Sequence, residues 1–173
     1  MARADTAVRR LILPALVLPL ALGACGDDPV GPAFPEDVEF AASLGIDLDE
    51  MTRLPDGVYI ETLVEGPEDE VPVTSGEVLV DYALWLPDGR LLQSTFEDAS
   101  VALDFELGMN EVIPGFESGM IGGGSNAMKV GELRRIIVPS EMGYGATGQG
   151  EIPPQTVLVF EVELLATPGS EPT

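Results

Sequence analysis

Two stretches of the chain alternate apolar and polar residues with the two-residue period of a β-strand. In Glu77–Leu86, EVLVDYALWL, the shared apolar face consists of Val78, Val80, Tyr82, Leu84 and Leu86. In Thr156–Leu165 the inner face consists of Leu158, Phe160, Val162 and Leu164, while Glu161 and Glu163 point to water. The chain therefore needs a sheet that is buried on one side.

Four further strands are predicted, at Val58–Val64, Arg90–Thr95, Ala102–Leu107 and Val130–Val138. The turn residues Pro87–Gly89 predict a hairpin between Glu77–Leu86 and Arg90–Thr95. One short helix is predicted from Pro114, which suits a first helical turn, to a cap at Gly122. The expected fold is α+β: a curved antiparallel sheet of five or six strands around one short helix.

The N-terminus has the pattern of an export signal. Arg3, Arg9 and Arg10 precede an apolar run, Leu11–Leu22, that is too short to span a bilayer. The following LGAC, residues 22–25, resembles the lipobox of bacterial lipoproteins, which implies cleavage before Cys25 and lipidation of that residue. The alternatives are a plain signal peptide with an incidental thiol, or a buried core cysteine.

These features divide the chain into four parts. Residues 1–24 are the expected lipoprotein signal peptide, and residues 25–56 the lipidated cysteine, a tether and a lead-in. Residues 57–165 are the expected globular domain, and residues 166–173 a disordered tail. Residues 26–35 are rich in Gly, Pro and Asp, whereas residues 36–52 form either a short helix or an irregular lead-in.

An anchored protein of this kind belongs to the cell envelope, on the extracytoplasmic side of a membrane. In some bacteria an aspartate directly after the lipidated cysteine retains lipoproteins at the inner membrane. Here that position is Gly26, which favours the outer membrane.

The net charge excludes polyanionic partners. The full chain carries 8 basic and 30 acidic residues. Removal of Arg3, Arg9, Arg10 and Asp5 with the signal peptide leaves 5 basic and 29 acidic residues, a net charge near −24. Such a surface repels nucleic acid and anionic lipid headgroups.

Several kinds of catalysis are excluded by composition. The chain has no histidine, which removes Ser-His and Cys-His triads and the usual zinc sites. The single cysteine allows no disulfide framework. The acidic run Asp47–Glu50 lacks the glycine and distal glutamate of an EF-hand loop. We expect neither a metal nor a cofactor.

The stretch GYGATGQGEIPP contains a formal G-x-G-x-x-G at Gly143, Gly145 and Gly148. A dinucleotide loop needs a helix directly after the third glycine, because the helix N-terminus holds the pyrophosphate. Pro153 and Pro154 follow within six residues and disfavour a helix there. The glycines therefore do not indicate a dinucleotide-binding loop.

Three segments together resemble the FKBP-type peptidyl-prolyl cis-trans isomerases: VLVDYALWLPDG, ELGMNEVIPGFESGM and VGELRRIIVPSEMGYGATGQGEIPPQTVLVFEVELL. The similarity covers about residues 57–165, in the order of the family. It implies a curved antiparallel sheet wrapped on a short helix, with a shallow apolar pocket between them that GYGATGQGEIPP covers as a flap. It also implies proline-containing polypeptides as substrates, and macrolides as possible ligands.

The implied chemistry needs no nucleophile. An Xaa–Pro bond isomerises slowly because rotation breaks amide resonance, with a barrier of about 18–20 kcal/mol. An apolar pocket that fits the twisted amide better than the planar one lowers that barrier.

The resemblance also assigns the site. The implied catalytic residues are Tyr82, Gln93, Tyr144 and Phe160. The implied substrate-binding residues are Leu92, Val112, Ile113, Phe116 and Ile152. Among these, the Ile113 N–H is expected to bind a substrate carbonyl, and the Tyr144 hydroxyl to reach the substrate from the flap.

The chain departs from the family at several of these positions. Phe116 replaces the usual tryptophan floor, Leu92 a phenylalanine, and Gln93 an aspartate. The flap is one residue shorter, and Gly122–Asn126 lengthens the connection after the helix.

The leading hypothesis is an active prolyl isomerase that assists the folding of exported proteins. The loss of a carboxylate at Gln93 favours an alternative, a peptide-binding or chaperone module with weak or lost activity. A third possibility is a structural spacer of the envelope.

Overall fold

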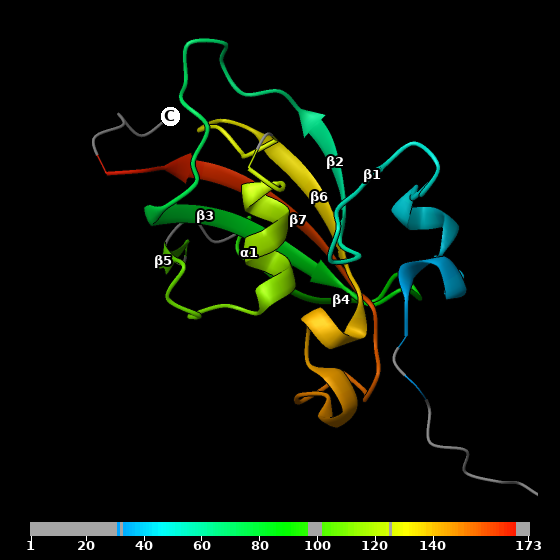
Figure 1. Ribbon diagram of the computed structural model, residues 1–173. Coiled ribbons are helices and arrows are strands. Elements are labelled where there is room, and N and C mark those ends of the chain that lie inside the picture. Colours follow the sequence, from blue (N-terminus) through cyan, green and yellow to red (C-terminus); the bar gives the residue numbers. More distant parts are fainter. Residues whose placement is uncertain (1–30, 32, 97–101, 125, 169–173) are drawn as a thin grey trace, which may run out of the picture.

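The computed structural model describes residues 31, 33–96, 102–124 and 126–168. The predicted signal peptide, Cys25 and residues 169–173 of the predicted tail lie outside the described residues. Within them, one α-helix lies against a curved antiparallel sheet (Figure 1). The expected α+β class is confirmed.

The sheet has seven strands in the order β1-β2-β6-β7-β3-β4, with β5 also paired to β3. Their bounds are β1 Thr52–Arg53, β2 Tyr59–Val64, β3 Gly76–Trp85, β4 Leu91–Ser94, β5 Leu103–Leu107, β6 Leu133–Val138 and β7 Leu158–Ala166. Every pairing is antiparallel. Six strands correspond to the predicted ones, and β1 is an addition. Two residues are too few to show a strand period.

Two predicted boundaries are corrected. Strand β6 begins at Leu133 and not at Val130, because Gly131 takes a φ of +83° in a turn that the Glu132 N–H closes on the Lys129 carbonyl at 3.0 Å. Strand β7 extends to Ala166, one residue into the predicted tail.

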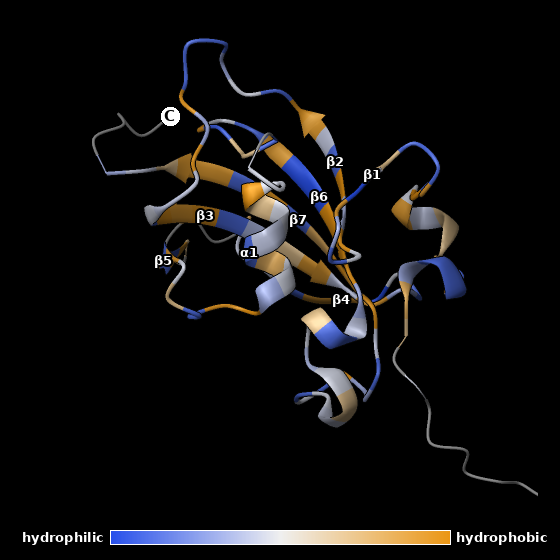
Figure 2. Ribbon diagram, in the orientation of Figure 1, coloured by the Kyte–Doolittle hydropathy of each residue, from blue (hydrophilic) through white to orange (hydrophobic). Residues whose placement is uncertain are grey.

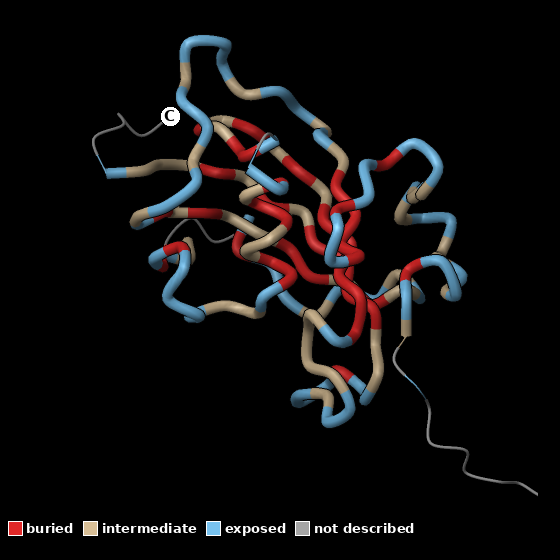
Figure 3. Tube along the Cα trace, viewed as in Figure 1, coloured by how far each residue is buried: buried red, intermediate tan, exposed pale blue. Residues whose placement is uncertain are grey.

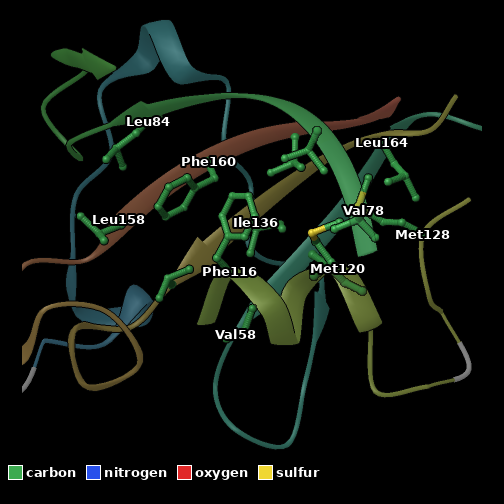
Figure 4. Close-up of a cluster of buried hydrophobic side chains, with 14 of the residues drawn as sticks. Val58, Val78, Leu84, Phe116, Met120, Met128, Ile136, Leu158, Phe160 and Leu164 are labelled. Carbon is green, nitrogen blue, oxygen red and sulfur yellow. The ribbon is translucent and has the colours of Figure 1, made fainter. Parts of the chain in front are cut away.

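Helix α1, Pro114–Ile121, covers the concave face of the sheet (Figure 1). It begins with a proline, and Gly122 caps its end in the left-handed conformation, as predicted. Beneath it lies the main core, which includes Val58, Val78, Met120, Ile136, Leu158 and Leu164 (Figure 4). Figure 2 shows the hydropathic alternation along β6 and β7, and Figure 3 the burial of the central strands.

Glycines allow the helix to approach the sheet this closely. A Cβ at Gly119 would lie 2.3 Å from Cγ2 of Ile136, and one at Gly115 would lie 2.3 Å from Cγ1 of Val138. Both neighbours are β-branched and fully buried, so neither side chain has space to move away. The distance between helix and sheet is therefore set by the absence of these two Cβ atoms.

A buried ion pair binds the C-terminal turn of α1 to the sheet. Arg134, on β6, donates from Nε and Nη2 to Oε1 of Glu132 at 2.8 and 2.5 Å. Its Nη1 donates to the Gly119 carbonyl at 2.9 Å. Glu132 also accepts from the Thr62 hydroxyl and the Lys129 N–H. Both charges are thus buried with their hydrogen bonds satisfied, as a stable buried pair requires.

The convex face of the sheet carries a second, smaller core. We call residues 33–51 the N-terminal segment. It contains the 3-10 turns η1, Pro35–Asp37, and η2, Ala42–Leu44, so the open choice between helix and irregular lead-in resolves to an irregular segment. Its half-buried Val38, Phe40, Leu44, Ile46 and Leu48, together with its buried Met51, pack against Tyr59, Ile137, Val157 and Val159. Ala33 and the buried Pro35, both within the predicted tether, already contact the domain.

No helix within the described ranges is long and apolar enough to cross a membrane.

We expect Gly119→Ala to destabilise the fold although alanine favours helix. The added methyl group overlaps Ile136, and overpacking of this kind costs about 1–3 kcal/mol. Urea unfolding measures the change. Gly31→Ala is the matched control, because no atom lies within 4 Å of the Cβ position there. Equal stability of the two variants would contradict the packing described above.

Candidate active site

Four aromatic rings from four different elements meet between the helix and the sheet. Phe116, from α1, packs edge-on against Tyr82 of β3, Phe105 of β5 and Phe160 of β7, with centroid distances of 6.0, 5.9 and 5.2 Å. Tyr82 and Phe160 are 6.5 Å apart. Figure 4 shows Phe116 directed from the helix toward Phe160 on the strand. These edge-to-face contacts hold the rings in a fixed arrangement.

Strand register brings these rings together. Phe160 lies opposite Leu84 on one side and Ile136 on the other. Tyr82 lies opposite Val162, two residues further along β7, so it projects from the same face of the sheet. Phe116 is in the first turn of α1 and contacts the rings of the sheet from the helix side.

The cluster has a buried floor and a half-buried rim. Phe105, Phe116 and Phe160 are each no more than 4% exposed. Tyr82, Leu92, Val112, Ile113 and Tyr144 pack against the same core but remain partly open to solvent. Ile152, in the loop, is 9% exposed and belongs to the core. The structure thus brings together eight of the nine predicted site residues.

Gln93 is the exception. It lies opposite Leu84 on β4, and its side chain is exposed. It is not part of the aromatic core.

A backbone donor is available beside the aromatic floor. Ile113 is the N-cap of α1, and its carbonyl accepts from the Phe116 and Glu117 N–H groups at 3.1 and 3.4 Å. The Ile113 N–H itself donates no hydrogen bond to any described residue. A donor of this kind suits a carbonyl oxygen of a bound peptide.

The loop that joins β6 to β7, residues 139–157, provides Tyr144 and Ile152; we call it the glycine-rich loop. It contains the 3-10 turns η3, Ser140–Met142, and η4, Gly145–Thr147. Beyond them Gln149 and Ile152 exchange two backbone hydrogen bonds of 2.9 and 2.8 Å. A Cβ at Gly148 would lie 2.3 Å from the Ile152 carbonyl oxygen. The glycines therefore serve a tight hairpin, and no helix follows the third glycine, as the prolines predicted.

The environment of Tyr82 affects its ionisation. Burial raises the pKa of Tyr82 above its ordinary value, and the nearby Tyr144 raises it further, since two phenolates repel. At neutral pH Tyr82 is protonated and offers a donor.

Two residues of the site were not predicted. Phe105 completes the aromatic cluster, and its position on the inner face of a predicted strand was the available signal. Thr95 is buried and fixes the backbone of Tyr82: its Oγ1 accepts from the Tyr82 N–H at 2.9 Å and donates to Oδ1 of Asp81 at 2.7 Å. The sequence around Thr95 carries no pattern that indicates this role.

Across the described ranges, no three His, Cys, Asp or Glu side chains are grouped so that they would hold a metal ion. The site consists of apolar walls, aromatic rings, two phenol hydroxyls and one backbone donor. It is suited to binding an apolar ring with an adjoining amide.

Comparison with known proteins agrees with this chemistry. The sequence model of the FKBP-type peptidyl-prolyl cis-trans isomerases matches residues 68–165. An FK506-binding protein of Neisseria meningitidis serogroup B is 44% identical over 110 residues, which are 63% of this chain and 94% of that protein. The peptidyl-prolyl cis-trans isomerase FKBP11 of Bos taurus is 40% identical over 63% of this chain and 52% of its own length.

Solved structures show the same fold. The crystal structure of AtFKBP13 has a TM-score of 0.61 at 30% identity and covers 68% of this chain and 98% of its own. A peptidyl-prolyl cis-trans isomerase from Pseudomonas syringae has a TM-score of 0.55 at 34% identity, covering 67% of this chain and 79% of its own.

Fold and site together provide an apolar binding surface, and the comparisons identify the class of enzyme that carries it. The chain belongs to the FKBP-type peptidyl-prolyl cis-trans isomerase family, and it is an isomerase of that class.

The position of Gln93 generates a prediction about this activity. The family resemblance implies an aspartate at this position, and β4 pairs directly with the strand of Tyr82. Because Gln93 is exposed, Gln93→Asp places no unpaired charge in the core, and we expect an unchanged melting temperature. We expect kcat/KM on one Xaa-Pro peptide to rise about two- to tenfold, because the negative charge of a carboxylate adds an electric field that acts on the twisting amide in the neighbouring site. If the folded variant is no faster, position 93 does not limit catalysis.

Proposed function

We propose that this isomerase acts on proline-containing segments of exported polypeptides, and that a lipid on Cys25 holds it at the extracytoplasmic side of a membrane. The observation that supports the substrate class is the aromatic floor of Phe116 and Phe160 next to the Ile113 N–H, which has no hydrogen-bond partner among the described residues. It combines a surface for a proline ring with a donor for the adjoining carbonyl.

The catalytic step follows from amide electronics. In the planar state, resonance places negative charge on the amide oxygen and positive charge on nitrogen, and twisting the C–N bond reduces this separation. Apolar surroundings therefore favour the twisted state over the planar one, which lowers the barrier. The proline ring packs on Phe116 and Phe160, and Tyr82 forms the wall beside them.

Two donors hold the substrate during rotation. The Ile113 N–H binds a carbonyl of the peptide, while the Tyr144 hydroxyl donates from the glycine-rich loop. Fixing the flanking chain in this way leaves the Xaa–Pro bond as the part that rotates. Val112, Leu92 and Ile152 complete the apolar contact.

The same surface suits macrolide ligands. The relatives in Neisseria meningitidis are named FK506-binding proteins. We infer that a macrolide of this kind competes with the peptide for the aromatic floor, because both present an apolar ring and carbonyl oxygens.

The cellular part of the proposal is supported by the leader sequence alone: three arginines, an apolar run and the sequence LGAC, which ends in Cys25. The strongly acidic composition fits a soluble domain held near a membrane without binding its anionic headgroups. Gly26 directly after the cysteine favours the outer membrane where the cell has one.

Removal of the Tyr144 hydroxyl tests the site. We expect Tyr144→Phe to lower kcat/KM about two- to tenfold, the value of one neutral hydrogen bond. Exchange of an Xaa-Pro peptide measured by NMR gives the rate. Tyr59→Phe is the matched control: it removes a phenol hydroxyl from the convex face and leaves the rate unchanged. Exchange at the uncatalysed rate with the unaltered protein would instead favour a peptide-binding module.

Replacement of Cys25 tests the anchor. We expect Cys25→Ala to move the protein from the membrane fraction to the soluble fraction, because each buried CH₂ of an acyl chain contributes about 0.8 kcal/mol of binding. Mass spectrometry of the mature protein provides an independent measurement. An unmodified thiol on a protein that still sediments with membranes would disprove the lipid anchor.

A further inference from the structure

Ser140 connects two parts of the chain that are distant in sequence. It is fully buried at the start of the glycine-rich loop. Its hydroxyl accepts a hydrogen bond from the Ala33 N–H at 2.9 Å, and its own N–H donates to the Ala33 carbonyl at 3.0 Å. The N-terminal segment is therefore paired with the loop through both groups of one residue.

The same hydroxyl continues the connection across the loop. Ser140 Oγ donates to Oε1 of Gln155 at 3.0 Å. The Gln155 N–H in turn donates to the Gly145 carbonyl at 2.8 Å, and Gly145 directly follows Tyr144. A continuous path of hydrogen bonds thus runs from Ala33 to the residue next to Tyr144.

The N-terminal segment also packs behind both ends of the loop. Ile137 lies just before the loop, and Val157 and Val159 lie at its return into β7. All three belong to the convex-face core that the segment covers. Their neighbours Val138, Leu158 and Phe160 project to the opposite face and belong to the core of the site.

Two further contacts hold the segment in place at other points. Glu36 accepts from the Tyr59 hydroxyl at 2.8 Å and from Arg53 Nε at 3.0 Å. The Ala41 N–H donates to the Pro87 carbonyl at 2.8 Å. The segment is thus fixed to the sheet independently of the loop.

We propose that the N-terminal segment positions the glycine-rich loop over the active site, and that Ser140 and Gln155 are the positioning residues through which it acts on Tyr144 and Ile152. Gln155 has a φ of +53°, which a non-glycine residue rarely adopts, and its hydrogen bonds on both sides hold it there. The segment is therefore a part of the enzyme and not only a link to the anchor. This rests on the proposed contact of Tyr144 with the substrate.

The experiment uses the full chain labelled with 3-fluorotyrosine. The chain has three tyrosines, so three ¹⁹F signals are expected and each is assigned by its Tyr→Phe variant. Ser140→Ala removes the hydroxyl that joins Ala33 to Gln155. We expect the Tyr144 signal to shift or broaden and the Tyr82 signal to stay. We expect kcat/KM to fall about three- to tenfold, as for one or two lost hydrogen bonds.

A second variant removes the contact from the segment's side. Ala33→Pro deletes the N–H that donates to Ser140 and replaces no residue of the loop or the site. We expect the same displacement of the Tyr144 signal with a smaller fall in kcat/KM. This variant decides the outcome if Ser140→Ala does not fold.

Glu36→Gln is the matched control. It weakens the contact with Arg53 and Tyr59 at a distance from the loop, so it moves the Tyr59 signal and leaves the Tyr144 signal and kcat/KM unchanged. An unchanged Tyr144 signal in folded Ser140→Ala and Ala33→Pro would overturn the proposal. A displaced Tyr144 signal with unchanged kcat/KM would support the positioning but contradict the proposed role of Tyr144 in catalysis.

Discussion

Side chains along β6 and β7 alternate between two cores, and the rest of the structure depends on this alternation. Ile136, Val138, Leu158 and Phe160 project toward α1, whereas Ile137, Val157 and Val159 project away from it. The first set packs in the main core and includes Phe160, which is part of the floor of the site. The second set packs against the N-terminal segment. The loop between the two strands follows Ile137 and Val138 and precedes Leu158 and Val159. Each of these pairs has one residue in each core, so both cores fix the position of the loop.

The chemistry of the site depends on what surrounds the substrate and not on a reactive group. The aromatic rings supply an apolar surface, and the Ile113 N–H and two phenol hydroxyls supply hydrogen-bonding groups that can orient the substrate. Acidic residues outnumber basic ones by 30 to 8 in the chain, and Glu132, the buried acidic residue of the described ranges, is paired with Arg134. An amide that loses charge separation as it twists is stabilised in such surroundings.

Much of the fold could be predicted because local patterns fix it. The alternation in β3 and β7, the Pro114 start and the Gly122 cap each identify an element. The structure of the N-terminal segment could not be predicted, because its apolar residues Val38, Phe40, Leu44, Ile46 and Leu48 recur at even spacings, as in a strand, yet the segment forms only two 3-10 turns. For the site, the family resemblance implied Tyr82, Phe116 and Phe160, but not Phe105 and not the exposure of Gln93. Gln93 lies on β4, the last strand in the order of the sheet, and no residue pattern reveals its exposure.

The central claim is that the proline ring of the substrate binds on the aromatic floor between α1 and the sheet. Intermolecular NOEs between the proline ring protons of an Xaa-Pro peptide and the assigned aromatic protons of the enzyme test it most directly. The structure predicts NOEs to Tyr82, Phe116 and Phe160 under conditions in which the peptide exchanges rapidly. Accelerated exchange with NOEs confined to another surface, such as the convex face around Tyr59, would contradict the claim.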